Sequence, residues 1–141
     1  MRRTFSTAVN NNGVNIWLLI ARLVVGALML THGIPKLQNL VSGNVQFADP
    51  FGIGATASLA LTVFAEAFCS ILLILGLATR LASVPLIINM LVAIFYAHAT
   101  QPLAKKELAI VYLIFFVGFL ILGGGKYSVD SLIFGKNRSR Y

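Results

Sequence analysis

Two charged residues interrupt otherwise apolar stretches of this sequence, and they are its first candidates for chemistry. Arg22 lies in the run IWLLIARLVVG and Glu66 in the run LTVFAEAFCSILL. A charge inside a membrane costs roughly 2.5–3.5 kcal/mol on insertion scales, so it usually has a partner or a function. Counting ~1.5 Å per residue from one face of the membrane places Arg22 about 10 Å and Glu66 about 16 Å deep. We therefore expect an Arg22–Glu66 pair, with Asn89 hydrogen-bonded in the same layer, serving either a ligand or helix register.

A second polar group is expected near the opposite ends of the same helices. His32 and Lys36 are four residues apart and share a helix face. Glu107 lies on the same helical stripe as Gly118, and a small residue in a membrane helix usually marks the packed side, so Glu107 is predicted to point inward. His98 completes this group. Alternatively, Lys36, His98 and Glu107 simply reach the membrane surface with their polar ends.

Two further observations limit the chemistry of these groups. Asn89 and His98 are nine residues apart, about 180° around a regular helix, so a regular helix cannot turn both inward. His32 and His98 have no tight ligand spacing, and we expect no metal site. The sequence GGGK at residues 123–126 lacks a preceding strand and phosphate-loop spacing, so it reads as the end of a helix. Ser128 or Asp130 is expected to cap a short amphipathic turn after it.

Four apolar segments must position these side chains, at about residues 15–34, 54–77, 81–99 and 103–122. Each approaches the ~20 residues that span a bilayer as a helix. The segments are continuously apolar rather than alternating, which favours helices over barrel strands. The predicted fold is therefore all-α, an integral membrane four-helix bundle that occupies residues 1–141 as one domain.

The connections predict how the four helices are arranged. Short corners at residues 77–80 and 100–102 indicate antiparallel neighbours. The loop at residues 38–53 is long and rich in Gly, Asn and Pro, and we expect it to cover one mouth of the bundle on the extracytoplasmic side. The tail at residues 126–141 is expected in the cytoplasm.

Basic residues are distributed unevenly between the two predicted faces, which indicates the topology. The face with Lys36, Lys105 and Lys106 has three of them, whereas the other face has seven, so both termini are predicted to be cytoplasmic. The seven are Arg2, Arg3, Arg80, Lys126, Lys136, Arg138 and Arg140.

Composition excludes several classes of function. Apolar residues make up 58% of the 141 residues and mean hydropathy is +0.88, which predicts a protein solvated by the lipid bilayer. The net charge of +7 reflects only four acidic residues rather than a dense basic patch, so we expect no nucleic-acid partner. Cys69 is the sole cysteine, which excludes dithiol chemistry within one chain. Any redox role must use a ligand or a partner.

The order and spacing of several motifs resemble the DoxX family of small bacterial four-helix membrane proteins. They comprise Arg22-Leu23, the sequence THGIPKL at residues 31–37, Glu66, LGLATRL at residues 75–81 and GGGKYSVD at residues 123–130. The resemblance covers roughly residues 17–134. It implies a place near membrane redox chemistry, since members are associated with thiosulfate:quinone oxidoreductase subunits and with membrane complexes of thiol and oxidative-stress defence.

The resemblance also suggests roles for the polar residues. Arg22, His32 and Lys36 would contact an anion or a quinone oxygen, and Glu66, or Glu107 with His98, would handle protons. The leading hypothesis is a component of a redox system in the bacterial inner membrane that binds quinone or a small sulfur anion and has no intrinsic cofactor. The alternatives are a noncatalytic scaffold that docks a soluble redox partner on its basic inner face, and a small-molecule carrier.

Overall fold

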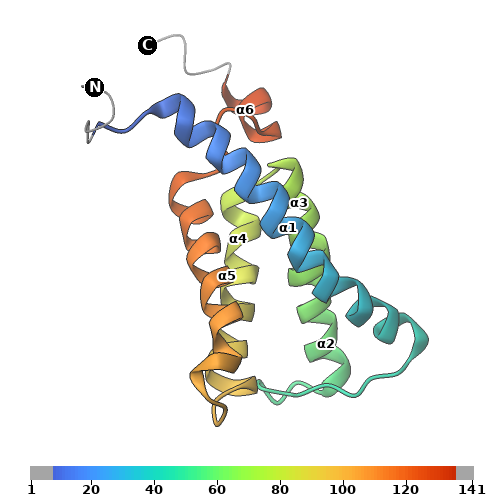
Figure 1. Cartoon of the computed structure of the whole chain (residues 1–141). Coiled ribbons are helices and arrows are strands. Elements are labelled where there is room, and N and C mark those ends of the chain that lie inside the picture. Colours follow the sequence, from blue (N-terminus) through green and yellow to red (C-terminus); the bar gives the residue numbers. More distant parts are fainter. Residues whose placement is uncertain (1–7, 136–141) are drawn as a thin grey trace.

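The computed structural model describes residues 8–135, which form helices and connecting segments with no strand among them. Its longest helix, α1, spans Asn11–Ser42 and crosses diagonally over the other helices (Figure 1). The Asn10 side chain caps its first turn by accepting hydrogen bonds from the backbone N–H groups of Asn12 and Gly13, and Gly43 ends it in the left-handed conformation. Helix α1 thus runs eight residues beyond the predicted end at residue 34, through Pro35.

Three further rods of helix complete the body of the protein. The first is divided into α2 (Ala55–Val63), the π-helical segment η1 (Phe64–Cys69) and α3 (Ser70–Leu75). The second consists of α4 (Thr79–Val92) and the π-helical segment η2 (Ala93–Ala97), and the third is α5 (Leu103–Leu122). A short helix, α6 (Val129–Phe134), follows with Ser128 as its N-cap, as expected.

The connections agree with an antiparallel arrangement. Gly76 ends α3 in the left-handed conformation and α4 begins three residues later, which makes a tight corner. Gly123 ends α5. Because α1 continues to Ser42, the long connection is shorter than expected, and α2 begins only after Gly54. This segment passes across the lower end of the molecule in Figure 1.

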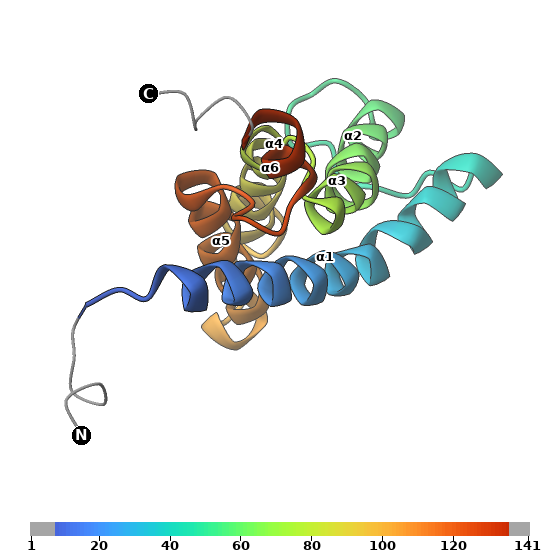
Figure 2. The same ribbon diagram turned by 90° about the horizontal axis from the view of Figure 1, so that it is seen from above.

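Apolar side chains from α1, α3, α4 and α5 meet in one core. Leu73, Leu86, Phe116 and Phe119 are fully buried in it. Viewed from above, the three shorter rods are grouped together and α1 passes along their side (Figure 2). A smaller apolar cluster, centred on Leu59, joins α2 to α1 and to the long connection. The side chains of Arg22 and Glu66 are buried among these helices.

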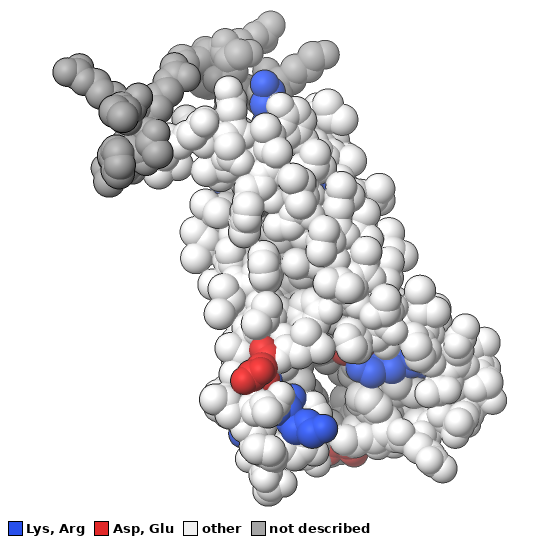
Figure 3. All heavy atoms as spheres, viewed as in Figure 1, with Lys and Arg blue, Asp and Glu red and all other residues white. Residues whose placement is uncertain are grey.

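The outer surface is unusually apolar. Large side chains such as Trp17, Phe95, Ile114 and Ile121 are at least half exposed. Figure 3 shows the same pattern, with a broad uncharged middle and most charged side chains toward the lower end. A surface of this kind is solvated by lipid rather than by water. Three helices of the described part are long and apolar enough to cross a membrane, at Asn11–Ser42, Ala55–Leu75 and Thr79–Ala97, so the chain is a multi-pass membrane protein.

Helix α5 differs from these three near its start. It has 20 residues, but Lys105, Lys106 and Glu107 fall within its first five.

Five of the residues used for the topology prediction lie outside the described residues, namely Arg2, Arg3, Lys136, Arg138 and Arg140.

Candidate functional site

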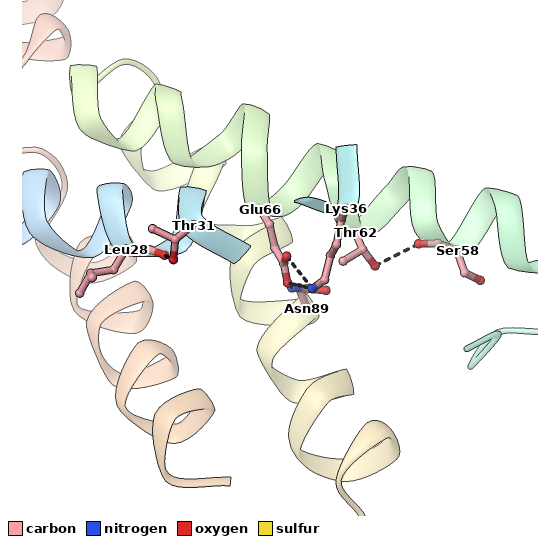
Figure 4. A network of polar contacts seen from close by, with 7 residues as sticks. All are labelled: Leu28, Thr31, Lys36, Ser58, Thr62, Glu66 and Asn89. Carbon is pink, nitrogen blue, oxygen red and sulfur yellow. Dashed lines mark hydrogen bonds and ion pairs between the residues drawn. The ribbon is translucent and has the colours of Figure 1, made fainter. Parts of the chain in front are cut away.

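A polar cluster joins three helical rods near the lower end of the molecule (Figure 4). The Lys36 ammonium lies 2.8 and 2.7 Å from the two carboxylate oxygens of Glu66. The Asn89 amide donates to Glu66 Oε1 at 2.7 Å, as expected from the sequence. The Glu66 side chain is 5% exposed and that of Lys36 is 32% exposed, so one partner is enclosed and the other reaches the surface. The charge pair is thus held by α1, η1 and α4 together.

The backbone around Glu66 explains how it reaches this position. Glu66 lies in the π-helical segment η1, a geometry that often occurs at functional sites. Gly33 packs directly against η1, since a Cβ atom at Gly33 would lie 2.7 Å from the carbonyl carbon of Glu66 and 2.8 Å from the nitrogen of Ala67. Pro35 is accommodated within α1, so Lys36 lies one turn beyond this close contact on the same helix. The approach of the two backbones brings Lys36 to the carboxylate.

A cavity of about 520 Å³ opens beside this cluster, and we call it the large cavity. Its walls are mainly apolar side chains of α2, η1, α4 and η2, and residues of the long connection also line it. The polar cluster forms one part of the wall, together with His98. The apolar lining residues include Phe47, Phe51, Leu61, Phe64, Ile88 and Val92. Mostly apolar walls with a few convergent polar groups are typical of small-molecule sites.

A second cavity of about 170 Å³, the small cavity, lies between α1, η2 and α5. Both cavities are lined by Lys36, Glu66, Ala93 and His98, so the charge pair belongs to both walls. The small cavity is more polar, since six of its eleven lining residues carry polar or charged groups. Its other lining residues include His32, Lys105 and Tyr112, and the rings of His32 and Tyr112 meet edge to face with centroids 6.1 Å apart.

The π-helical segment η2 resolves the conflict between Asn89 and His98. A π-helical turn contains more residues than an α-helical turn, so each residue rotates by less than about 100°. Because η2 occupies five of the positions between them, Asn89 and His98 both line the large cavity. Nitrogen Nδ1 of His98 is buried, and no described residue forms a hydrogen bond with it.

The structure places Glu107 differently from the prediction. Its side chain is exposed and it belongs to neither cavity. The packed side of α5 consists of Ala109, Tyr112, Phe116 and Phe119. A Cβ atom at Gly118 would meet nothing within 4 Å, so this glycine lies on an open side of the helix and was misleading. The expectation that Glu107 faces the polar centre is wrong.

The predicted pair of Arg22 with Glu66 is also wrong. Arg22 is completely buried and donates to the carbonyl oxygens of Leu73 and Ile74, at 3.2 and 3.3 Å, and to that of Tyr127. Arg22 and Lys36 are fourteen residues apart on one helix, about 21 Å along its axis. Glu66 pairs with Lys36 and not with Arg22. Arg22 therefore belongs to a different region, and it lines neither cavity.

The region around Arg22, which we call the clasp, joins the corner between α3 and α4 to the segment between α5 and α6. Both carboxylate oxygens of Asp130 accept hydrogen bonds from backbone N–H groups at the start of α4, from Ala78 at 2.7 Å and from Thr79 at 2.9 Å. The Asp130 N–H donates to the carbonyl of Gly76 at 2.9 Å. Gly76 has φ of +73°, and a Cβ atom there would lie 2.2 Å from Nη1 of Arg22. Three of the motifs used for the family resemblance therefore meet in one structural unit.

Some residues of the two cavities were not anticipated as site residues. Lys105 was used only to predict topology, and Tyr112 gave no signal because an aromatic residue in an apolar helix is usually core. The long connection was predicted to cover one mouth of the bundle, but the part of its Phe47 and Phe51 side chains in the cavity wall was not predicted. The proximity of Lys36 to Glu66 depends on α1 continuing through Pro35, which the sequence pattern did not indicate.

Comparison with known proteins agrees with the motifs. The DoxX family model matches residues 17–99. An uncharacterized protein of Haemophilus influenzae is 32% identical over 131 residues, covering 85% of this chain and 92% of the relative. A Bacillus subtilis protein named "Putative oxidoreductase CatD" is 27% identical over 125 residues, covering 88% of this chain and 92% of the relative. No solved structure gave a significant match. The chain belongs to the DoxX family.

Proposed function

We propose that this protein is a component of a membrane redox system that binds a quinone in the large cavity. The observation that carries the proposal is the combination of an apolar cavity of about 520 Å³ with one polar end at Lys36, Glu66 and Asn89. Ligand cavities typically measure about 300–1,000 Å³ and orient the ligand through a few polar groups. A quinone has the matching division into a polar head and an apolar tail. The name of the Bacillus subtilis relative also refers to an oxidoreductase.

The side chains suggest how a quinone head would be held. The Lys36 ammonium and the His98 imidazole are donors for a quinone oxygen, and Asn89 keeps the Glu66 carboxylate oriented. Reduction of a quinone takes up two electrons and two protons. Glu66 and His98 are the groups placed to supply protons, and the electrons would come from a sulfur anion or a reduced partner protein. The tail would leave between α2 and α4, where Leu61, Phe64 and Ile88 are exposed.

The proposed topology is an antiparallel bundle of four membrane-crossing rods in the bacterial inner membrane. The charged start of α5 would lie at the extracytoplasmic surface of this membrane, near the long connection. Arg80 and Lys126, which are exposed near the clasp, would face the cytoplasm with both termini. In this orientation the large cavity lies in the outer half of the membrane.

Binding of a short-chain quinone to the purified protein in lipid nanodiscs tests the proposal by calorimetry. Glu66→Gln should weaken binding by roughly tenfold or more, because the substitution releases Lys36 and removes a charged hydrogen-bonding group. Glu107→Gln is the matched control, since Glu107 is an exposed glutamate outside both cavities, and it should leave the affinity within about twofold. Absence of binding in the unmodified protein, or equal weakening by both variants, would contradict the proposal. Thiosulfate, titrated in the same way, tests the alternative of a small sulfur anion.

A noncatalytic scaffold is the second candidate, favoured by the exposed basic residues Arg80 and Lys126 beside the clasp. Such a surface would attract an acidic soluble redox protein. A partner that copurifies with the full chain, remains in Glu66→Gln and is lost on removal of residues 136–141 would support this role. A partner lost in Glu66→Gln would instead connect it to the polar cluster.

A further inference from the structure

The two cavities meet at one buried carboxylate, and their walls differ in chemistry. The large cavity is bordered by side chains that are also exposed on the apolar surface, including Leu61 and Ile88. The small cavity is bordered by Lys36, Lys105, His32, His98 and Tyr112. Glu66 therefore has an apolar space on one side and a polar space on the other.

The small cavity has the size and the polar groups that water requires. A water molecule needs at least ~10–15 Å³ of such space and two to four polar partners, so a volume of about 170 Å³ accommodates several. Donors and acceptors come from α1, η1 and α5 and from His98, which follows η2, while apolar side chains such as Met29 and Met90 line the rest. Buried nitrogen Nδ1 of His98 has no hydrogen-bond partner among the described residues. Buried polar atoms are nearly always paired, and water in a cavity that His98 lines would pair this nitrogen.

The position of the small cavity gives that water a route to the surface. In Figure 3 the face is hollowed between the lower parts of α1 and α5, and basic side chains lie beside the hollow. Lys105 is exposed and Lys36 is partly exposed, whereas Glu66 is enclosed behind them. Water in the small cavity therefore lies between the enclosed Glu66 carboxylate and the protein surface at Lys36 and Lys105.

We propose that the small cavity is a water-filled vestibule through which Glu66 exchanges protons with the outer aqueous phase, with His98 as the relay between the two cavities. Both His98 and Glu66 line the small cavity, so the proton moves from water to the His98 imidazole and on through a cavity water to a Glu66 carboxylate oxygen. It returns by the same route, and only O–H and N–H bonds are broken and formed. The charged and titratable groups around Glu66 are Lys36, Lys105, His32, His98 and Tyr112. The inference deepens the proposed function, on which it rests for the choice of Glu66 as the proton-handling group.

Cysteine accessibility in proteoliposomes tests the water-filled vestibule. Ala65 and Ala109 form a matched pair, since both are buried alanines and each lines one cavity, the large and the small respectively. In a Cys69→Ala background, Ala109→Cys should react with an anionic, membrane-impermeant methanethiosulfonate roughly tenfold or more faster than Ala65→Cys, because a charged reagent follows water and not lipid. Met90→Cys replaces Ala109→Cys if the latter folds poorly, since Met90 is also buried and lines only the small cavity. Equal rates, or faster reaction at residue 65, would overturn the vestibule.

The relay is tested by infrared spectroscopy after a pH jump. The carboxyl band that disappears in Glu66→Gln reports protonation of Glu66. His98→Gln should slow its appearance by roughly 10²-fold, the lower end of the usual range for loss of a positioned proton carrier. Glu107→Gln should change nothing. An unchanged rate in His98→Gln would overturn the relay. Neither measurement uses quinone, so failure of quinone binding and failure of the vestibule give different results.

Discussion

The clasp and the Glu66 cluster both enclose charge near an apolar core, yet the two regions use it differently. Arg22 is fully enclosed and satisfied largely by backbone carbonyls at the end of α3 and after α5. Glu66 is also buried, but it borders two cavities and pairs with a partly exposed lysine. The Arg22 guanidinium, which is hydrogen-bonded to carbonyls at helix ends, has no cavity beside it for a ligand. The Glu66 carboxylate borders two cavities. Burial of a charge in a membrane therefore indicates a function only when space adjoins it.

The largest difference between the two regions is expected from removal of the basic residue in each. Arg22→Leu loses hydrogen bonds to three carbonyls, worth ~1.5–3 kcal/mol each for a charged donor, and it saves only ~2.5–3.5 kcal/mol of charge burial. We expect a net loss of several kcal/mol, seen as a much lower midpoint of thermal unfolding in detergent. Lys36→Met should lose far less, because Lys36 is partly exposed and Asn89 still donates a hydrogen bond to Glu66. Equal losses in the two variants would remove the distinction between the regions.

A glycine substitution tests how closely α1 must approach the cluster. Gly33→Ala places a methyl group within 2.9 Å of three backbone atoms of Glu66 and Ala67, so the two helices must separate. We expect a loss of about 1–3 kcal/mol of unfolding free energy together with weaker quinone binding. Gly118→Ala is the matched control, since its Cβ meets nothing within 4 Å, and it should be neutral or stabilising by up to about 1 kcal/mol. Unchanged binding in Gly33→Ala would show that the approach does not position Glu66.

A smaller effect is expected from the carboxylate that completes the clasp. Asp130 accepts hydrogen bonds from the N–H groups of Ala78 and Thr79 and so caps α4 from a distance in the sequence. Asp130→Ala should cost about 1–2 kcal/mol, the usual range for loss of an N-cap. Hydrogen exchange of the first turn of α4 should rise while exchange around Glu66 stays unchanged. A matching rise around Glu66 would show that the two regions are coupled.

The smallest effect concerns the connection that covers the large cavity, and it depends on pH. Hydrogen bonds from the backbone of Gly54, and also from the Ser58 hydroxyl and the Ile53 N–H, hold the pKa of Asp49 below its usual value. The folded pKa is lowered, so this stabilisation is present above the unfolded pKa of about 3.9 and is lost as the pH falls through the folded pKa. Amide exchange at Ile53 and Gly54 should therefore accelerate in acid, relative to the intrinsic rate, while the clasp stays protected. Asp49→Asn should remove this pH dependence, and a dependence that persists would assign it to another group.

Residue patterns alone predicted much of the fold but only part of the site. Apolar runs placed the helical rods to within a few residues, except that α1 extends through Pro35 to Ser42. Estimating membrane depth from the number of residues along each helix correctly predicted the hydrogen bond between Asn89 and Glu66, because both residues lie on rods that run side by side. It failed for Arg22 because α1 crosses the others diagonally (Figure 1), so equal counts from the helix ends do not give equal positions. It failed for Glu107 because Gly118 lies on an open side of α5.

The sequence by itself determined the solvent, the helical class and the family of this protein, because hydropathy and motif order are properties of the chain. Only the tertiary structure decided which charges meet. The acceptors of Arg22 are backbone carbonyls, which no residue type reveals. The π-helical segments η1 and η2 change the direction of side chains by a fraction of a turn, which brings Glu66, Asn89 and His98 to one cavity. Direction around a helix depends on such local geometry, and so the site could be read only after folding.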